Sequence, residues 1–124
     1  MIVLLDTHAL LWALAASPRL SATARDVIED TGNIVLVSVV SAWEIEIKKA
    51  LGQLEAPDDL EDAIEAAGFL KRLVTFADAR HLGALPGHHK DPFDRMLVAQ
   101  AIVDGAPLIS VDPQIARYPI QVIW

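Results

Sequence analysis

The sequence predicts an α/β fold of three layers, with a central, mainly parallel sheet of short strands between two layers of helices. Short apolar segments alternate with amphipathic ones along the whole chain, which is the order of strands and helices in such folds. The apolar segments are continuous rather than alternating, as expected for strands covered on both faces. The 124 residues contain no repeat or linker, so we expect one domain over residues 1–124.

The positions of the apolar segments predict five strands and six helices. The strands are Ile2–Leu5, Ile34–Val40, Leu73–Val74, Leu108–Val111 and Gln121–Trp124, the last at an edge of the sheet. The helices are residues 7–16, 21–31, 41–51, 57–67, 77–85 and 91–104. The strand segments are rich in β-branched and aliphatic residues, and helices between them would make the strands parallel.

Two of the helices have strong start signals. Asp91 can accept hydrogen bonds from the free backbone N–H groups of the sixth helix, and Pro92 suits its first position. Ser41 and Glu44 match the capping box, in which a Ser is followed three residues later by a Glu. We therefore expect the third helix to begin at Ser41.

Apolar residues at helical spacing predict which face of the third helix is buried. They are Trp43, Ile47, Ala50 and Leu51. We expect Trp12, in the first helix, to be buried as well. An apolar helix face that includes either tryptophan could alternatively contact a partner.

Composition argues against several classes of protein. The chain has no cysteine, so it can form neither disulfides nor a thiolate metal site. Its formal net charge of −7 argues against binding nucleic acid through a broad basic surface. The apolar start lacks a basic segment and is interrupted by Asp6 and His8, so we do not interpret it as a signal peptide. No segment is long enough to span a membrane, and we expect a soluble, cytoplasmic protein.

Four acidic residues each begin a helix or a connection. Asp6, Glu44 and Asp112 follow predicted strands, and Asp94 lies in the first turn of the sixth helix. Because the carboxyl ends of parallel strands lie at one edge of a sheet, we expect these carboxylates to meet there. Carboxylates that meet repel one another unless a cation joins them, and Mg²⁺ or Mn²⁺ takes oxygen ligands. Zinc fits less well, because there is no cysteine and no paired-histidine motif.

Each of these acids also has a structural explanation. Asp6 and Asp112 can cap the turns that follow them, and an acid such as Asp94 is favoured in any first helical turn. Glu44 can complete the capping box or pair with Lys48, four residues further on. For each residue taken alone, the structural and the functional explanation stay open.

Four segments together resemble a known family. They are LLDTHALLWAL, SAWEIEIKKALG, HKDPFDRMLVAQA and ISVDPQIARYPIQVIW. In this order they resemble the PIN-domain family and, more narrowly, the VapC-type ribonuclease toxins of type II toxin–antitoxin systems. The resemblance covers nearly the whole chain. It implies a PIN-like fold with a shared acidic pocket, Mg²⁺- or Mn²⁺-dependent cleavage of RNA, homodimerisation and inhibition by a small cognate antitoxin.

The same resemblance implies roles for individual residues. The four acids that match the catalytic, metal-binding positions are Asp6, Glu44, Asp94 and Asp112. Accessory roles are expected for Thr7, Ser110, Asp91 and Arg95, with Asp91 mainly a helix cap. Arg95 and the segment His88–Lys90 are candidates to contact RNA phosphates, and ordinary surface charge is the alternative. His8 is expected to be a packing or surface residue.

Other functions remain as alternatives. A non-catalytic PIN-like module that binds RNA or protein would lack one of the acids, and all four are present. A phosphotransfer fold of the haloacid-dehalogenase type would need a second Asp two residues after Asp6, where the chain has His8. A receiver domain would need a Lys after a late strand, and Ser110–Asp112 offers none.

Overall fold

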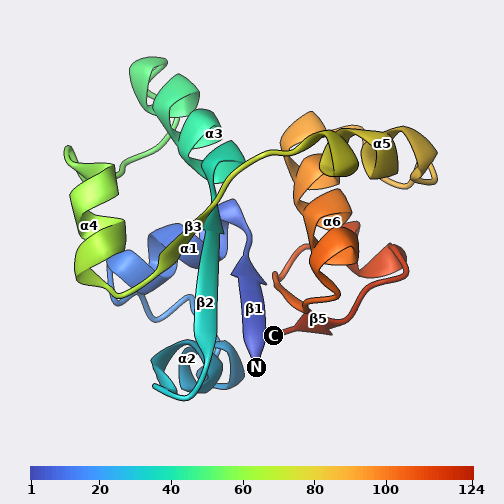
Figure 1. Ribbon diagram of the computed structural model, residues 1–124. Coiled ribbons are helices and arrows are strands. Elements are labelled where there is room, and N and C mark those ends of the chain that lie inside the picture. Colours follow the sequence, from blue (N-terminus) through green and yellow to red (C-terminus); the bar gives the residue numbers. More distant parts are fainter.

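The computed structural model describes residues 1–124 and contains a five-stranded parallel sheet (Figure 1). The strands are β1 (Ile2–Leu5), β2 (Ile34–Ser38), β3 (Leu70–Arg72), β4 (Leu108–Ile109) and β5 (Val122–Ile123). Their order is β3-β2-β1-β4-β5, and every neighbouring pair is parallel. The predicted fold class is confirmed, as is the place of the last strand at an edge.

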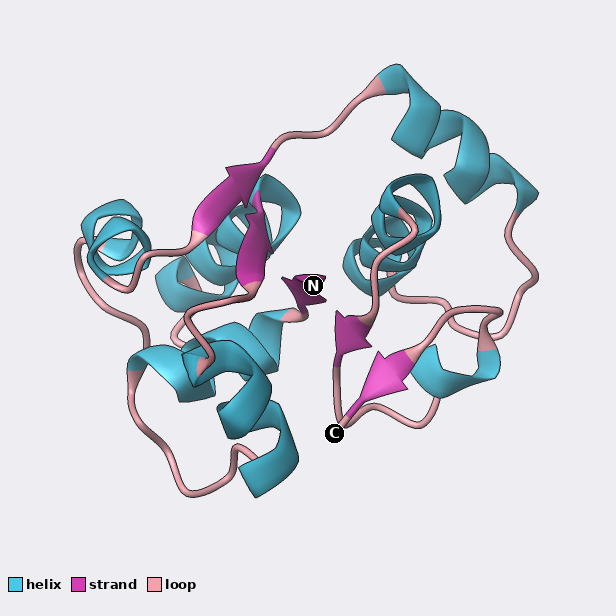
Figure 2. Cartoon of the chain, turned by 60° about the horizontal axis from the view of Figure 1, so that its bottom comes forward, coloured by secondary structure: helices cyan, strands magenta, loops and turns pink.

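Helices cover both faces of this sheet (Figure 2). They are α1 (Thr7–Leu14), α2 (Ala22–Glu29), α3 (Val39–Ala50), α4 (Leu60–Ala66), α5 (Phe76–Ala84) and α6 (Pro92–Asp104), with a 3₁₀ turn at Ile115–Arg117. In Figure 1, α1 and α4 lie to the left of β1 and β2, α5 and α6 lie to the right, and α2 lies at the lower end of β2. None of the helices combines the length and apolar character that crossing a membrane requires.

The central strand divides the hydrophobic core into two clusters. Val3 and Leu5 of β1 point to one face, where they join buried residues of α1, α2 and α4. Leu4 points to the opposite face and packs with Leu97 and Val98 of α6. All three β1 side chains are fully buried, which explains why the strand is a continuous apolar run.

The start of α3 differs from the prediction. Strand β2 ends at Ser38, whose hydroxyl caps α3 by accepting a hydrogen bond from the backbone N–H of Val40 at 3.1 Å. The predicted capping box at Ser41 is therefore wrong, and both Ser41 and Glu44 lie inside the helix. The β-branched pair before Ser41 favoured a longer strand, but Val40 gains more by packing against the α6 side of the core.

The buried face of α3 is also different from the predicted one. Trp43, Ile47 and Leu51 are 63%, 39% and 65% exposed, and Ala50 is exposed too. The helix instead buries the face that carries Ser41 and Glu44. Apolar periodicity identified the wrong face because two polar residues occupy the buried one. Trp12 is half-buried against the core, with its ring 5.7 Å from that of Trp124.

Smaller corrections concern β3 and the helices beside it. Strand β3 precedes the predicted Leu73–Val74, which forms an exposed connection to α5. Helix α4 begins after its cap Asp59 rather than at Pro57. Helix α5 is capped by Thr75, which forms a reciprocal capping box with Asp78. Both ends of α6 are as predicted, with Asp91 as the N-cap and a left-handed glycine just after Asp104.

Candidate functional site

The four predicted acids come from the ends of the central strands and the helices next to them. Asp6 directly follows β1, and Glu44 lies in α3, which directly follows β2. Asp112 follows β4, and Asp94 lies in the first turn of α6. Strand β1 lies between β2 and β4. The first strands of the chain continue the sheet on one side of β1, and the later strands continue it on the other. Ligand sites in open α/β sheets form at such a switch point.

Asp6 is buried and fixed at the end of β1. Its backbone N–H donates to the carbonyl of Ile109 at 3.1 Å, and its Oδ1 accepts from the N–H of Ala9 at 2.8 Å. Burial raises the pKa of Asp6, while hydrogen bonds from the Ser110 hydroxyl and Ala9 act against that rise. The charge of His8 also lowers the pKa of Asp6, and that of Asp112 raises it. Asp6 is thus a helix cap and part of an acidic pocket at once.

Glu44 is also buried, with both oxygens engaged. Its Oε1 accepts from the Thr7 hydroxyl at 2.6 Å, and that hydroxyl oxygen lies 3.2 Å from Oγ of Ser41. Its Oε2 accepts from Nζ of Lys48 at 2.5 Å, which confirms the predicted i,i+4 pair. This hydrogen bond raises the pKa of Lys48. Thr7 therefore joins the end of β1 to α3 through Glu44.

His89 connects the two remaining acids. Its Nε2 lies 2.9 Å from Oδ2 of Asp94 and 3.2 Å from Oδ2 of Asp112. The pKa of Asp94 is raised to about 7, first by burial and then by the charges of Asp91, Glu44 and Asp6, while His89 acts in the opposite direction. Asp94 is therefore close enough to these three acids to be influenced by each.

The accessory residues divide into two groups. Thr7 and Ser110 touch the acids, as described above. Asp91 accepts from the N–H groups of Phe93 at 2.8 Å and Asp94 at 3.1 Å, so its main task is capping α6. The guanidinium of Arg95 donates to the carbonyl of Pro86 at 2.8 Å and to the hydroxyl of Tyr118 at 3.1 Å.

Most of the basic residues predicted to contact RNA phosphates instead make contacts within the protein. The hydrogen bonds of Arg95 hold the connection between α5 and α6 in place. The ring of His88 packs against Tyr118 at a centroid distance of 5.1 Å, and His89 faces carboxylates. Lys90 is exposed. Sequence reasoning did not identify Tyr118, Ser41 or the place of His89 among the acids, because these contacts join distant segments and leave no local signal.

The donor atoms in the pocket suit a hard divalent cation. Nε2 of His89 and carboxylate oxygens of Asp94 and Asp112 all lie within 4.8 Å of one another, which fits ligands around one ion. Asp6 and Glu44 are not part of this group, although the charges of both raise the pKa of Asp94. The crowding of carboxylates that raises the pKa of Asp94 is the kind of repulsion that a bound cation relieves.

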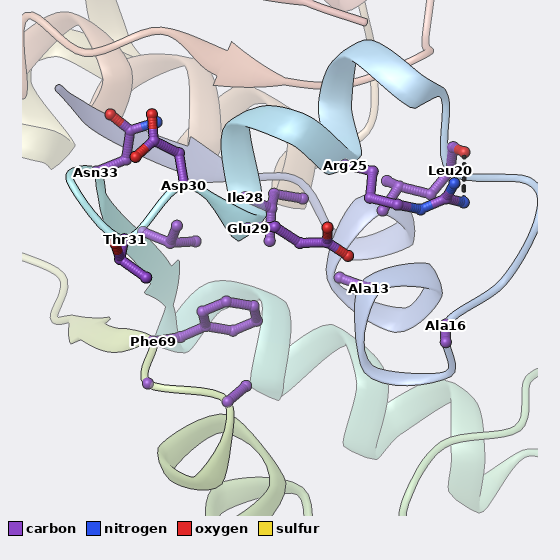
Figure 3. A pocket seen from close by; sticks show the side chains of 13 residues that line it. Ala13, Ala16, Leu20, Arg25, Ile28, Glu29, Asp30, Thr31, Asn33 and Phe69 are labelled. Atoms are coloured by element: carbon purple, nitrogen blue, oxygen red, sulfur yellow. Dashed lines mark hydrogen bonds between the residues drawn. The ribbon is translucent and has the colours of Figure 1, made fainter.

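The largest cavity lies elsewhere. It measures about 480 Å³ and is bounded by α1, α2 and the starts of β2 and β3, as Figure 3 shows. Arg25 lines it and donates from Nη2 to the carbonyl of Leu20 at 3.3 Å. Val35 and Phe69 line its apolar side. It contains none of the predicted site residues and lies at the amino ends of the strands, opposite the acidic pocket.

Comparison with protein families supports the resemblance seen in the sequence. The profile described as PIN domain matches residues 3–121. The chain belongs to the PIN-domain family. None of the curated protein sequences compared with this PIN domain matches it.

Solved structures show the same fold. VapBC2 from Rickettsia felis, bound to a DNA fragment from its promoter, aligns with a TM-score of 0.67 at 12% identity, over 98% of this PIN domain and 97% of that chain. A toxin–antitoxin complex from Klebsiella pneumoniae gives 0.65 at 21% identity, over 94% and 92%. FitAcB from Neisseria gonorrhoeae gives 0.60 at 15% identity, over 97% and 95%.

Proposed function

We propose that this PIN domain is a metal-dependent endoribonuclease and the toxin of a type II toxin–antitoxin pair. The observation that carries the proposal is the acidic pocket, in which donor atoms of His89, Asp94 and Asp112 lie within 4.8 Å of one another and the buried acids Asp6 and Glu44 lie at the same ends of the strands. We further propose that residues 1–124 act as one domain and that the protein works in the cytoplasm, where its RNA substrate is found.

We assign a different role to each residue of the pocket. Asp94 and Asp112 would bind Mg²⁺ or Mn²⁺. The carboxylates of Asp6 and Glu44 would add to the negative electrostatic potential at the ion. When bound, the ion lowers the pKa of a water and offsets charge developing on a phosphodiester. The pKa of Asp94 is raised to about 7 without metal, so binding of the ion would release the proton of this carboxyl near neutral pH. Thr7 and Lys48 fix the position of the Glu44 carboxylate through hydrogen bonds to its two oxygens.

Cleavage of a mixed RNA pool by the purified protein tests the proposal. We expect cleavage with Mn²⁺ or Mg²⁺, loss with EDTA, and a rate at least about 100-fold lower for Glu44→Gln, because a buried carboxylate of the pocket is removed. Glu46→Gln is the matched control, since Glu46 is exposed on the same helix and should change little. Equal cleavage by Glu44→Gln would point to a contaminating nuclease.

If no sample cleaves the pool, a thermal-shift titration with Mn²⁺ gives a second test. Stabilisation by the ion in the wild type but not in Glu44→Gln supports the metal pocket and a narrow choice of RNA. No stabilisation in either protein would favour the alternative, a non-catalytic module that binds RNA or protein.

The proposed partner is a small antitoxin protein. Two of the solved structures that share the fold are described as a VapBC assembly and a toxin–antitoxin complex. A short reading frame next to the gene for this chain would support the pairing. Its absence would weaken the toxin assignment without affecting the proposed nuclease.

We also propose a homodimer formed through the exposed apolar stripe of α3. Trp43, Ile47 and Leu51 follow one another at four-residue spacing, so they lie on one face of the helix, and all are exposed. The ring of Trp43 also meets Phe93 of α6 edge-on at 5.2 Å, which extends the patch. In a purified sample, a second copy is the partner available to cover this surface.

Replacing Ile47 by Glu is expected to weaken the dimer at least about tenfold, since a charge would lie in the centre of its apolar contact. Sedimentation velocity over a concentration series measures the change. Leu73→Glu is the matched control, because Leu73 is 64% exposed but lies in the connection between β3 and α5. A wild-type protein that stays monomeric, or equal weakening by both variants, would contradict this interface.

A further inference from the structure

His89 occupies a central place among the acids that the family resemblance does not explain. Its side chain is 20% exposed, and its Nε2 lies between Oδ2 of Asp94 at 2.9 Å and Oδ2 of Asp112 at 3.2 Å. By distance alone these two oxygens and Nε2 of His89 could all surround one ion, so the orientation of the ring decides between a ligand and a competitor. The imidazole and an ion would therefore use the same oxygens.

The contacts of the ring indicate which nitrogen carries the hydrogen. Nδ1 of His89 faces the backbone N–H of Asp91 at 3.4 Å and so acts as an acceptor. Nε2 then carries the N–H and donates to the two carboxylates. A metal-binding histidine has the reverse arrangement, with its lone pair toward the ion and its other N–H on an acceptor. His89 is thus oriented as a hydrogen-bond donor within the pocket, not as a ligand.

The backbone around His89 is held independently of the acids. Its N–H donates to the hydroxyl of Tyr118 at 3.0 Å, and Tyr118 is buried. Arg95 donates to the same hydroxyl and to the carbonyl of Pro86, at the start of the connection that carries His89. The ring would therefore stay beside the carboxylates without being pulled there by them alone.

We propose that His89 competes with the divalent cation for Asp94 and Asp112, so that metal binding requires its Nε2–H to leave these oxygens. This inference rests on the proposed function, because it concerns regulation of the same pocket. Hydrogen bonds to ionised carboxylates are about twice as strong as neutral ones, so withdrawing the single Nε2–H that Asp94 and Asp112 share weakens the binding of any ion. Without the imidazole, the carboxylates would be open to the ion and less neutralised.

Isothermal titration of the metal-free protein with MnCl₂, in the absence of RNA, tests the competition. We expect His89→Ala to bind Mn²⁺ at least about tenfold more tightly than the wild type, because the hydrogen bond that Nε2–H shares between the two carboxylates no longer has to break. His88→Ala is the matched control, since His88 lies on the same connection but packs on Tyr118 and should leave the Kd unchanged. Weaker or unchanged Mn²⁺ binding by His89→Ala would overturn the inference.

His89→Gln provides a second variant for the case in which His89→Ala loosens the connection, as judged from thermal melting in EDTA. The Gln amide can still donate to carboxylates, so its Kd should lie between those of the wild type and His89→Ala. Pulsed electron paramagnetic resonance of the Mn²⁺-loaded wild type should show no directly bound nitrogen, and a nitrogen coupling lost in His89→Ala would make His89 a ligand and refute competition. Failure of all samples to bind Mn²⁺ would instead refute the proposed function.

Discussion

Replacing Asp94 by Asn is expected to abolish RNA cleavage and, in the absence of metal, to make the folded protein more stable at pH 8. Asn keeps the size of Asp94 but removes its charge, so one of the two closest carboxylates can no longer attract the ion. We expect the cleavage rate to fall at least about 100-fold. The same change relieves repulsion with Asp91, Glu44 and Asp6, whose charges raise the pKa of Asp94.

The pH dependence of this stability gain has a definite sign. Burial and neighbouring acids raise the pKa of Asp94 to about 7, whereas the unfolded chain releases the proton near 3.8. Between these values the folded state binds more protons, so the free energy of unfolding of the wild type falls as pH rises. Asn cannot ionise, and the variant lacks this slope. After allowance for solvent screening and the lost His89 contact, we expect a gain of roughly 1–2 kcal/mol at pH 8.

Thermal melting in EDTA from pH 4.5 to pH 8 measures this effect. Asp26→Asn is a suitable control, because Asp26 is exposed on α2 and the substitution should leave both cleavage and melting unchanged. If Asp94→Asn cleaved RNA at the wild-type rate, or was less stable than the wild type throughout this range, Asp94 would be a structural residue of α6.

Replacing Asp78 by Ala is expected to destabilise the protein by about 3–5 kcal/mol, the usual cost of removing one partner of a buried ion pair. Asp78 is fully buried and accepts from both terminal nitrogens of Arg72, at 2.9 and 2.7 Å. It also accepts from Nε2 of Gln100 at 3.2 Å and from the N–H of Thr75 at 2.9 Å. One carboxylate thus joins β3, α5 and α6. Melting should fall by roughly 10–20 °C.

Acid should remove the same stabilisation. Burial alone would raise the pKa of Asp78, but hydrogen bonds from Arg72, Thr75 and Gln100 outweigh it and leave the pKa below 3.8. The contribution is therefore present above the unfolded pKa and is lost as pH falls through the lower folded pKa. Asp104→Ala removes only the more exposed partner of Arg72 and should cost about 1 kcal/mol or less. A similar loss from both variants would show that Asp78 has no special role.

The features that were predicted best are those that depend on residues close together in the sequence. Asp91 and Pro92 mark the start of α6, and the alternation of apolar segments gives the parallel sheet. Helix α3 shows the limit of this reasoning. Its buried face carries Ser41 and Glu44, whose burial is acceptable because Thr7, from a distant segment, contacts both side chains and Lys48 pairs with Glu44.

The site shows the same limit. The expectation that Asp6, Glu44, Asp94 and Asp112 lie at one edge followed from the parallel direction of the strands, which the alternation of elements made predictable. The position of His89 does not follow from it. The ring reaches Asp94 and Asp112 only because Tyr118, 29 residues away in the chain, anchors its backbone. A contact of this kind depends on how a connection packs after the sheet has formed.

The place of β1 in the middle of the sheet has a consequence for the protein during its synthesis. The chain passes from β1 first to β2 and β3 on one side, with Asp6 and Glu44, and only later to β4 on the other, after Asp94 and before Asp112. A nascent chain that has left the ribosome only as far as α4 therefore carries half of the proposed pocket. The nuclease we propose would become active only after β4 has paired with β1. An incomplete chain would therefore not cleave the messenger RNA from which it is being translated.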